Sequence, residues 1–175
     1  MTTITETKPR IYVAGLAAYN NGYLHGAWID ATQDEWAIWD GIQTMLAASP
    51  IPDAEEHAIH DYEGFGGIRL TEYEPIDVMA ALAAFVGEQG ALGAAVLEHF
   101  GGDFDEAREA LADNYLGCHA SLAGYVQELT EETTTIPGPL RFYIDWQAMA
   151  RDAEMSGDLF TIETGYEQTH VFAAR

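Results

Sequence analysis

Several short motifs of this 175-residue chain contain His, Cys, Asp or Gly, the residue types that form metal and phosphate sites. His57 and His60 are three positions apart, but strand positions i and i+3 point to opposite faces, so the two rings would not converge on one metal. The His-Glu-x-x-His pattern of zinc hydrolases does not occur. Residues 103–105 (Asp-Phe-Asp) begin like a calcium loop, yet Arg108 stands where an EF-hand needs glycine. We therefore expect no metal and no cofactor.

Two further motifs favour structural roles. The glycine-rich residues 64–67 lack the Lys-Ser/Thr that follows in a phosphate loop, and their surroundings are acidic, so we predict a turn. Cys118 and His119 are adjacent in sequence, which is no sign of a catalytic dyad, and we expect a buried thiol. Carboxylates are plentiful but no pair stands out. We therefore expect no enzyme, and a carboxylate-pair hydrolase stays open as an alternative.

The charge of the chain is strongly unbalanced. It carries 29 Asp and Glu against 7 Lys and Arg, a formal net charge of −22, and Lys8 is its one lysine. Nucleic-acid binding needs a basic patch, but no base lies between Arg10 and Arg69, so nucleic acids and anionic membranes are disfavoured partners. Disorder is also disfavoured, because 48% of the residues are hydrophobic. At the charge density of DNA, about one per 1.7 Å of axis, this net charge would cover roughly 37 Å.

Some of the acids stand where they reduce stability. Asp105, Glu109 and Asp113 recur at i, i+4 and i+8 of a predicted helix, where like charges destabilise by about 0.2–0.5 kcal/mol per pair. The acids within residues 128–132 crowd the C-terminal end of another predicted helix, where the macrodipole disfavours each by roughly 0.3–1 kcal/mol. A solvated surface tolerates such costs at one site. Their repetition along a chain with almost no lysine weakens that interpretation and points to a functional negative surface.

The elements that must carry these residues begin with a small sheet. Residues 11–19 and 22–30 are predicted strands joined by an Asn-Gly turn, the strongest short hairpin signal. Residues 32–35 (Thr-Gln-Asp-Glu) fit a capping box, and the following helix should run to about Ala48 with Ile38, Ile42, Met45 and Leu46 buried. Residues 57–62 are a plausible third strand.

The middle of the chain is predicted to be helical, and the last third mixed. Two helices should follow Pro75, the second over residues 91–100, and Asp103 should cap a third. No apolar run reaches the ~18 residues of a membrane span. In the last third we predict helices over residues 118–132 and 146–155, with strands over 140–144, 159–164 and 170–174.

This order predicts an α+β fold. The chain should form three small lobes: a three-stranded sheet plus helix (1–70), a helical middle lobe (71–115) and a mixed α/β C-terminal lobe (116–175). Each third is too small for a large core, so we expect an elongated arrangement.

Four segments of the chain resemble ArdA-type antirestriction proteins, in the expected order and over about residues 10–172. The resemblance implies a DNA mimic of plasmids, conjugative transposons and prophages, which binds the DNA groove of type I restriction-modification enzymes and blocks restriction. It also implies an elongated three-lobed fold, a homodimer formed through the C-terminal lobe, and an antirestriction motif around residues 125–145. The segments are RIYVAGLAAYNNGYLHGAWIDA, EEHAIHDYEGFGG, HFGGDFDEAREAL and IPGPLRFYIDWQAMARDAEMSGDLF.

With this resemblance, surface carboxylates are expected to take the place of phosphates and to pair with Lys and Arg of the enzyme, in its methyltransferase core. Binding should then weaken steeply with salt, and no single carboxylate should dominate. The candidate contacts are Asp30, Asp34, Asp40, Glu55, Glu56, Asp61, Glu63, Glu72, Glu74, Asp77, Asp103, Asp105, Glu109, Asp113, Glu128, Glu131 and Glu132.

The setting of the protein and one further alternative also follow from composition. The N-terminal sequence MTTITETKPR lacks the apolar region of a signal peptide, and one cysteine cannot form an internal disulfide, so we expect a cytoplasmic protein. Acidity could instead be an adaptation to high salt. That alternative predicts an excess of Asp, whereas Glu is the more frequent acid here.

Overall fold

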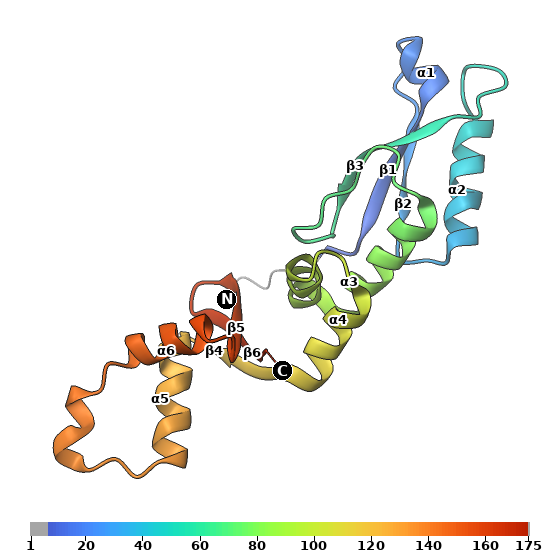
Figure 1. Ribbon diagram of the computed structural model, residues 1–175. Helices are drawn as coiled ribbons and strands as arrows, with labels where there is room; N and C mark the ends of the chain where they lie inside the picture. The colour runs from blue at the N-terminus through green and yellow to red at the C-terminus, as the bar shows by residue number, and fades with distance from the viewer. Residues whose placement is uncertain (1–6, 175) are drawn as a thin grey trace. The chain divides into compact units, whose positions relative to one another are not determined.

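The computed structural model describes residues 7–174 and divides the chain into two compact units, Met1–Glu98 and His99–Arg175 (Figure 1). Each unit has its own three-stranded antiparallel sheet with helices beside it, which confirms the predicted α+β class. The division into three lobes at residues 70 and 115 stays a prediction.

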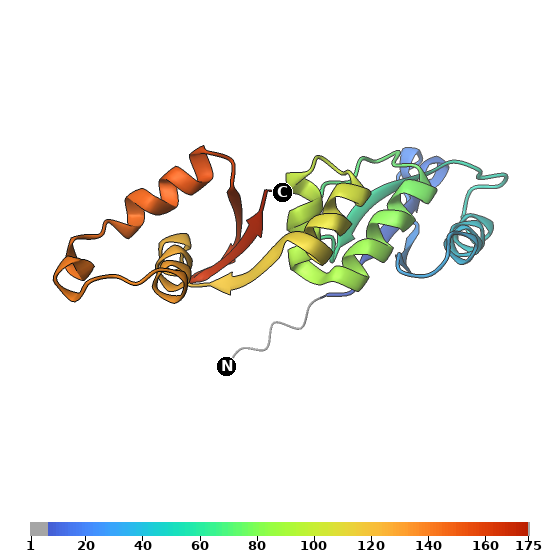
Figure 2. The ribbon, with the colours of Figure 1, turned by 60° about the horizontal axis from the view of Figure 1, so that its bottom comes forward.

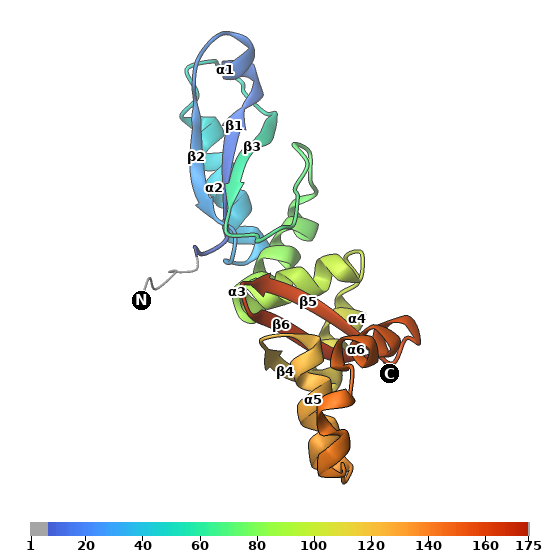
Figure 3. The same ribbon diagram turned by 90° about the vertical axis from the view of Figure 1, so that its left-hand side faces the viewer.

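The sheet of unit 1 has β1 at its centre. β1 (Arg10–Gly15) pairs antiparallel with β2 (Gly26–Asp30) on one side and with β3 (His57–Glu63) on the other (Figure 3). Ile11 lies opposite Ile29 of β2 and Tyr62 of β3. The strand predicted over residues 57–62 is therefore confirmed, and β1 carries hydrogen bonds on both edges.

The predicted two-residue hairpin between β1 and β2 is wrong. β1 ends at Gly15, and the chain forms a short helix, α1 (Leu16–Asn20), before the Asn-Gly pair. Ala18 of this helix is fully buried, and the Asn21 side chain donates to the carbonyl of Ala17 at 2.7 Å. Gly22 has a φ of 83°. Asn followed by Gly in a left-handed conformation ends a helix as readily as it closes a hairpin.

The helix α2 (Glu35–Ala47) lies along the sheet of unit 1 (Figure 1). Its buried residues are the four predicted ones, Ile38, Ile42, Met45 and Leu46. The cap differs from the prediction: Asp34, not Thr32, accepts the N–H of Ala37 at 2.9 Å. Thr32 instead donates its hydroxyl to Asp30 at 2.6 Å, which holds the turn between β2 and α2.

The helical region α3 (Ile76–His99) is two helices joined at Gly90, whose φ of 72° and ψ of −163° are not helical. Two helices in this stretch were predicted. By length and composition alone α3 is apolar enough to cross a membrane, which corrects the expectation that no such stretch exists. The break at Gly90 and the burial of Met79, Val86 and Leu97 are typical of core helices in a folded domain.

Residues 64–67 form a turn, as predicted, and Gly64 is required there for two reasons. Its φ is 83°, and a Cβ on it would collide with the carbonyl oxygen of Thr7 and lie 2.7 Å from the carbonyl carbon of Lys8. This close approach lets Phe65 bury its ring, which is 1% exposed.

Unit 2 begins with α4 (Phe104–Glu109), continues as a π-helical turn η1 (Ala110–Asn114), and enters the strand β4 (Tyr115–His119). α5 (Leu122–Thr133) and α6 (Trp146–Met155) follow, joined by a connection that holds the 3₁₀ helix η2 (Gly138–Tyr143) (Figure 2).

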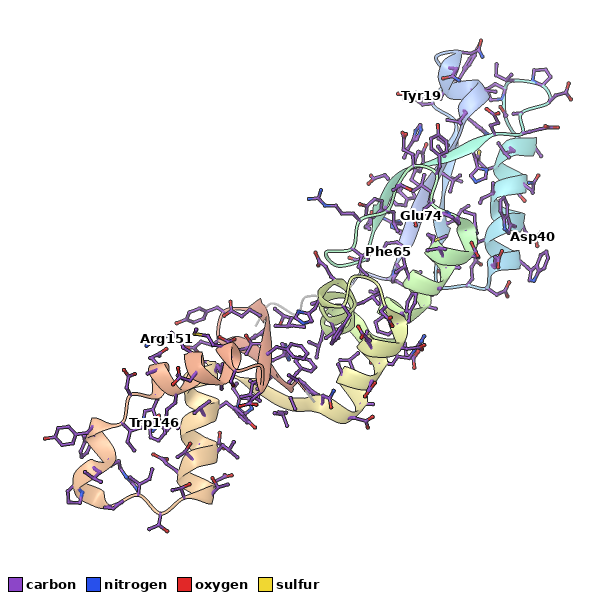
Figure 4. All side chains as sticks on the ribbon, viewed as in Figure 1. Tyr19, Asp40, Phe65, Glu74, Trp146 and Arg151 are labelled. Atoms are coloured by element: carbon purple, nitrogen blue, oxygen red, sulfur yellow. The ribbon has the colours of Figure 1, made fainter. Side chains whose placement is uncertain are left out.

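The strands β5 (Leu159–Gly165) and β6 (Gln168–Ala173) complete the sheet of unit 2, in the order β4-β6-β5. This closing strand pair was predicted, as was the capping of α6 by Asp145, which accepts the N–H of Ala148 at 3.0 Å. Leu122, Val126, Ala150 and Val171 form the core between the two helices and the sheet, and Trp146, labelled in Figure 4, packs against it.

Two predictions in the last third are wrong. The helix predicted from residue 118 starts at Leu122, because Ser121 is its cap and accepts the N–H of Gly124, while Cys118 belongs to β4. The strand predicted over residues 140–144 is η2 instead. Pro139 has no N–H for a sheet and a φ that suits a helical turn, and Leu140 donates to the carbonyl of Pro137.

Gly64→Ala should lower the free energy of unfolding by more than Gly22→Ala. The two glycines have the same φ of 83°, so each substitution strains the backbone by about 1–2 kcal/mol, but at Gly22 nothing lies within 4 Å of the added Cβ. Urea unfolding of both variants separates the backbone strain from the collision. Equal losses for the two variants would show that the close approach to Thr7 and Lys8 does not matter.

Candidate functional site

The carboxylates of both units lie at the surface. Within residues 7–174 none is buried: Asp30, Glu63 and Glu74 are half-buried, and every other Asp and Glu is exposed. The whole chain has only 7 Lys and Arg to set against 29 acids. Most of the surface carboxylates are therefore left to attract cations from the solution.

Two of the seventeen candidates are paired within unit 1. The strand register places Arg10 of β1 opposite both Asp30 of β2 and Glu63 of β3. Arg10 Nη2 donates to Glu63 Oε1 at 2.7 Å, and Lys8 Nζ donates to Asp30 Oδ2 at 2.7 Å. The Lys8 ammonium and the Thr32 hydroxyl lower the pKa of Asp30 to about 2. These two carboxylates already have a base beside them and are less available to a partner.

The other candidates of unit 1 have no ion pair with a base among the described residues. Asp34 caps α2, and Asp40 points from α2 away from the sheet (Figure 4). Glu74, before α3, accepts the N–H and the hydroxyl of Thr71 at 3.1 and 2.9 Å. The remainder are exposed on loops, on β3 and at the start of α3: Glu55, Glu56, Asp61, Glu72 and Asp77.

In unit 2 the first group of candidates surrounds α4. Asp103 caps this helix by accepting the N–H of Asp105 at 3.0 Å, and Arg108 approaches the carboxylate of Asp105 at 3.9 Å. Glu109 is the last residue of α4. Asp113 lies in the π-helical turn η1, whose i→i+5 turns replace the α-helix predicted there, and the shared face of the three acids stays a prediction.

The second group in unit 2 lies at the C-terminal half of α5. Glu128 Oε2 is 4.0 Å from His119 Nδ1, and the last turn of α5 carries no base. Glu131 and Glu132, together with Arg141, line a surface hollow of about 330 Å³. The unfavourable placement of acids at this helix end, expected from the sequence, is thus present in the structure.

Sequence reasoning missed further acids that are equally exposed. Their positions outside apolar helix faces were a usable signal, because a charged side chain beside a buried stripe normally faces solvent. These are Glu35, Asp53, Glu88, Glu98, Glu106, Asp145, Asp152, Glu154, Asp158, Glu163 and Glu167.

The metal-like motifs of the sequence do not converge in the described part of the chain. No three His, Cys, Asp or Glu side chains within it are placed to hold one ion, and His57 packs on Trp39 while His60 packs on Tyr19. Cys118 is exposed rather than buried as expected. No carboxylate of residues 7–174 is buried, and the carboxylate-pair hydrolase stays an alternative.

Asp30→Asn should destabilise unit 1 in a pH-dependent way. The pKa of Asp30 is lowered in the folded protein, so its contribution is present above its unfolded value near 4 and is lost as the pH falls toward 2. The carboxylate is 42% exposed, so we expect only about 0.5–1 kcal/mol at pH 7. Urea unfolding of the wild type and the variant from pH 7 to 2.5 measures the difference in their free energies of unfolding. A difference that stays constant over that range would contradict the ion-pair explanation.

A comparison with curated proteins gives no match. The family model described as "Antirestriction protein (ArdA)" matches residues 11–168, which end where β6 begins and include nearly all of the exposed acids. The chain belongs to the ArdA antirestriction protein family.

Proposed function

We propose that this protein inhibits type I restriction-modification enzymes by occupying the groove that binds DNA. The observation that carries the proposal is the surface of exposed carboxylates with very few basic side chains among them. Family membership supplies the antirestriction activity. The carboxylates act as phosphate substitutes, and ions released from both surfaces drive binding. The free, exposed Cys118 suits a reducing cytoplasm, which we include in the proposal.

The proposed partner surface is the methyltransferase core of the enzyme, because that part must bind DNA before any cleavage. Its groove has to present Lys and Arg to phosphates, so it offers a complementary charge. The contact is spread over many carboxylates, each worth little when exposed. Loss of one carboxylate should therefore have a small effect, whereas loss of several should add up.

Replacing Glu55, Glu56 and Glu72 together by Gln should weaken binding and its dependence on salt. Each carboxylate lost from a contact lowers the slope of log K against log salt by up to about one. Competition with fluorescent DNA for a purified type I methyltransferase, from 50 to 200 mM salt, measures both effects.

The matched control is the double variant Asp30→Asn, Glu63→Gln, which removes carboxylates that Lys8 and Arg10 already neutralise. It should lower stability while leaving the salt slope nearly unchanged. The DNA-mimic proposal fails if the wild-type protein does not displace DNA at 50 mM salt, and distributed charge recognition fails if the triple variant keeps the wild-type slope.

We also propose that the protein dimerises through unit 2. The connection between α5 and α6 exposes Leu140, Phe142 and Tyr143 on η2, with Phe142 92% exposed. Adjacent exposed apolar side chains of this size mark an interaction surface. A dimer would double the charge offered to a two-fold symmetric target.

Phe142→Asp should convert the dimer to a monomer at micromolar concentration, because it places a charge in an apolar contact. Sedimentation equilibrium measures the change. Tyr166→Asp is the control, because Tyr166 is 91% exposed in the turn between β5 and β6, away from η2. A dimer that survives Phe142→Asp but not Tyr166→Asp would place the interface at the β5–β6 turn.

A further inference from the structure

One tryptophan of unit 1 is almost fully exposed on an acidic helix. Trp36 of α2 is 81% exposed, whereas Trp28 is 40% exposed and Trp39 packs against His57. A large aromatic ring left in water does not help folding, and exposed indoles are enriched where proteins bind partners. No ring or cation contacts Trp36 among the described residues of the chain.

Trp36 shares its helix face with a free carboxylate. Asp40 is four residues later in α2, so its Cβ lies about 5–6 Å from that of Trp36 along the helix surface. Asp40 is exposed, and within the described residues it forms no ion pair. The helix carries no Lys or Arg, and Asp34 and Glu35 stand at its start. An indole ring and a carboxylate thus lie next to each other on a helix whose charged residues are all negative.

The same unit shows what such a pair binds. Arg10 places its guanidinium carbon 4.3 Å from the ring centroid of Trp28, while its Nη2 donates to Glu63 at 2.7 Å. One arginine therefore uses an indole face and a carboxylate at once. Trp36 and Asp40 supply the same two chemical groups on the surface of α2, without the cation.

We propose that Trp36 and Asp40 together receive an arginine side chain from the DNA-binding groove of the inhibited enzyme, a proposal that rests on the proposed function. The guanidinium stacks on the indole and donates to the carboxylate, which a compact ammonium group does less well. DNA-binding grooves are rich in arginine, and α2, whose charged residues are all acidic, is complementary to them. Stacking on the indole adds a contribution to the binding free energy that carboxylates alone do not supply.

Two substitutions separate the stacking on the indole from the ion pair with the carboxylate, because only the ion pair depends on salt. Trp36→Ala should weaken binding to a type I methyltransferase about tenfold with an unchanged salt slope, because a ring releases no counterions. Asp40→Asn should weaken binding and lower the slope by about one. The double variant should lose less than the product of the two effects, because both groups hold one arginine. Competition with fluorescent DNA from 50 to 200 mM salt gives all three values.

Two control variants test the role of the ring. Trp36→Phe should retain part of the affinity, since a phenyl face also stacks on a guanidinium. Tyr166→Ala removes an aromatic ring of unit 2 that is 91% exposed, and it should leave the affinity unchanged. Circular dichroism and melting confirm that each variant is folded. The proposal is overturned if Trp36→Ala binds like the wild type, or if its effect and that of Asp40→Asn multiply independently. If the wild type itself fails to displace DNA, the proposed function fails instead.

Discussion

The need to keep the carboxylates hydrated is the constraint on which the rest of this structure depends. With a net charge of −22, every Asp and Glu must stay hydrated, since a buried carboxylate without a base would be too costly. The described acids accordingly lie at the surface of two units that each have a small apolar core. The few bases can pair with only a few of these acids. Two of the bases, Lys8 and Arg10, lie near the start of the central strand β1.

The positions of those two bases explain how a small sheet tolerates an acidic surface. Arg10 and Lys8 reach Glu63 on one neighbouring strand and Asp30 on the other, so both edges of β1 are tied by charge as well as by backbone hydrogen bonds. Elsewhere acids serve locally as helix caps, as Asp103 and Asp145 do, where the positive end of the helix favours them. Most of the other carboxylates of residues 7–174 form neither an ion pair nor a helix cap, and these are left for a basic partner.

Much of the fold could be predicted because local patterns agreed with the final packing. The apolar spacing in α2 identified its whole buried face, and Asp145 marked the start of α6. Predictions failed where one local signal fits two structures. Asn21-Gly22 ends the helix α1 instead of closing a hairpin, and the apolar residues of η2 resemble a strand but follow prolines that cannot join a sheet.

The sequence by itself determined the excess of acids, the scarcity of bases and their family pattern, because these depend only on composition and order. It also placed Trp36 and Asp40 on one face of a helix, since helical spacing is local. Only the tertiary structure decided which carboxylates are already neutralised. Lys8 and Asp30 are 22 residues apart, and Arg10 and Glu63 are 53 apart, so strand pairing alone brings each base to its acid.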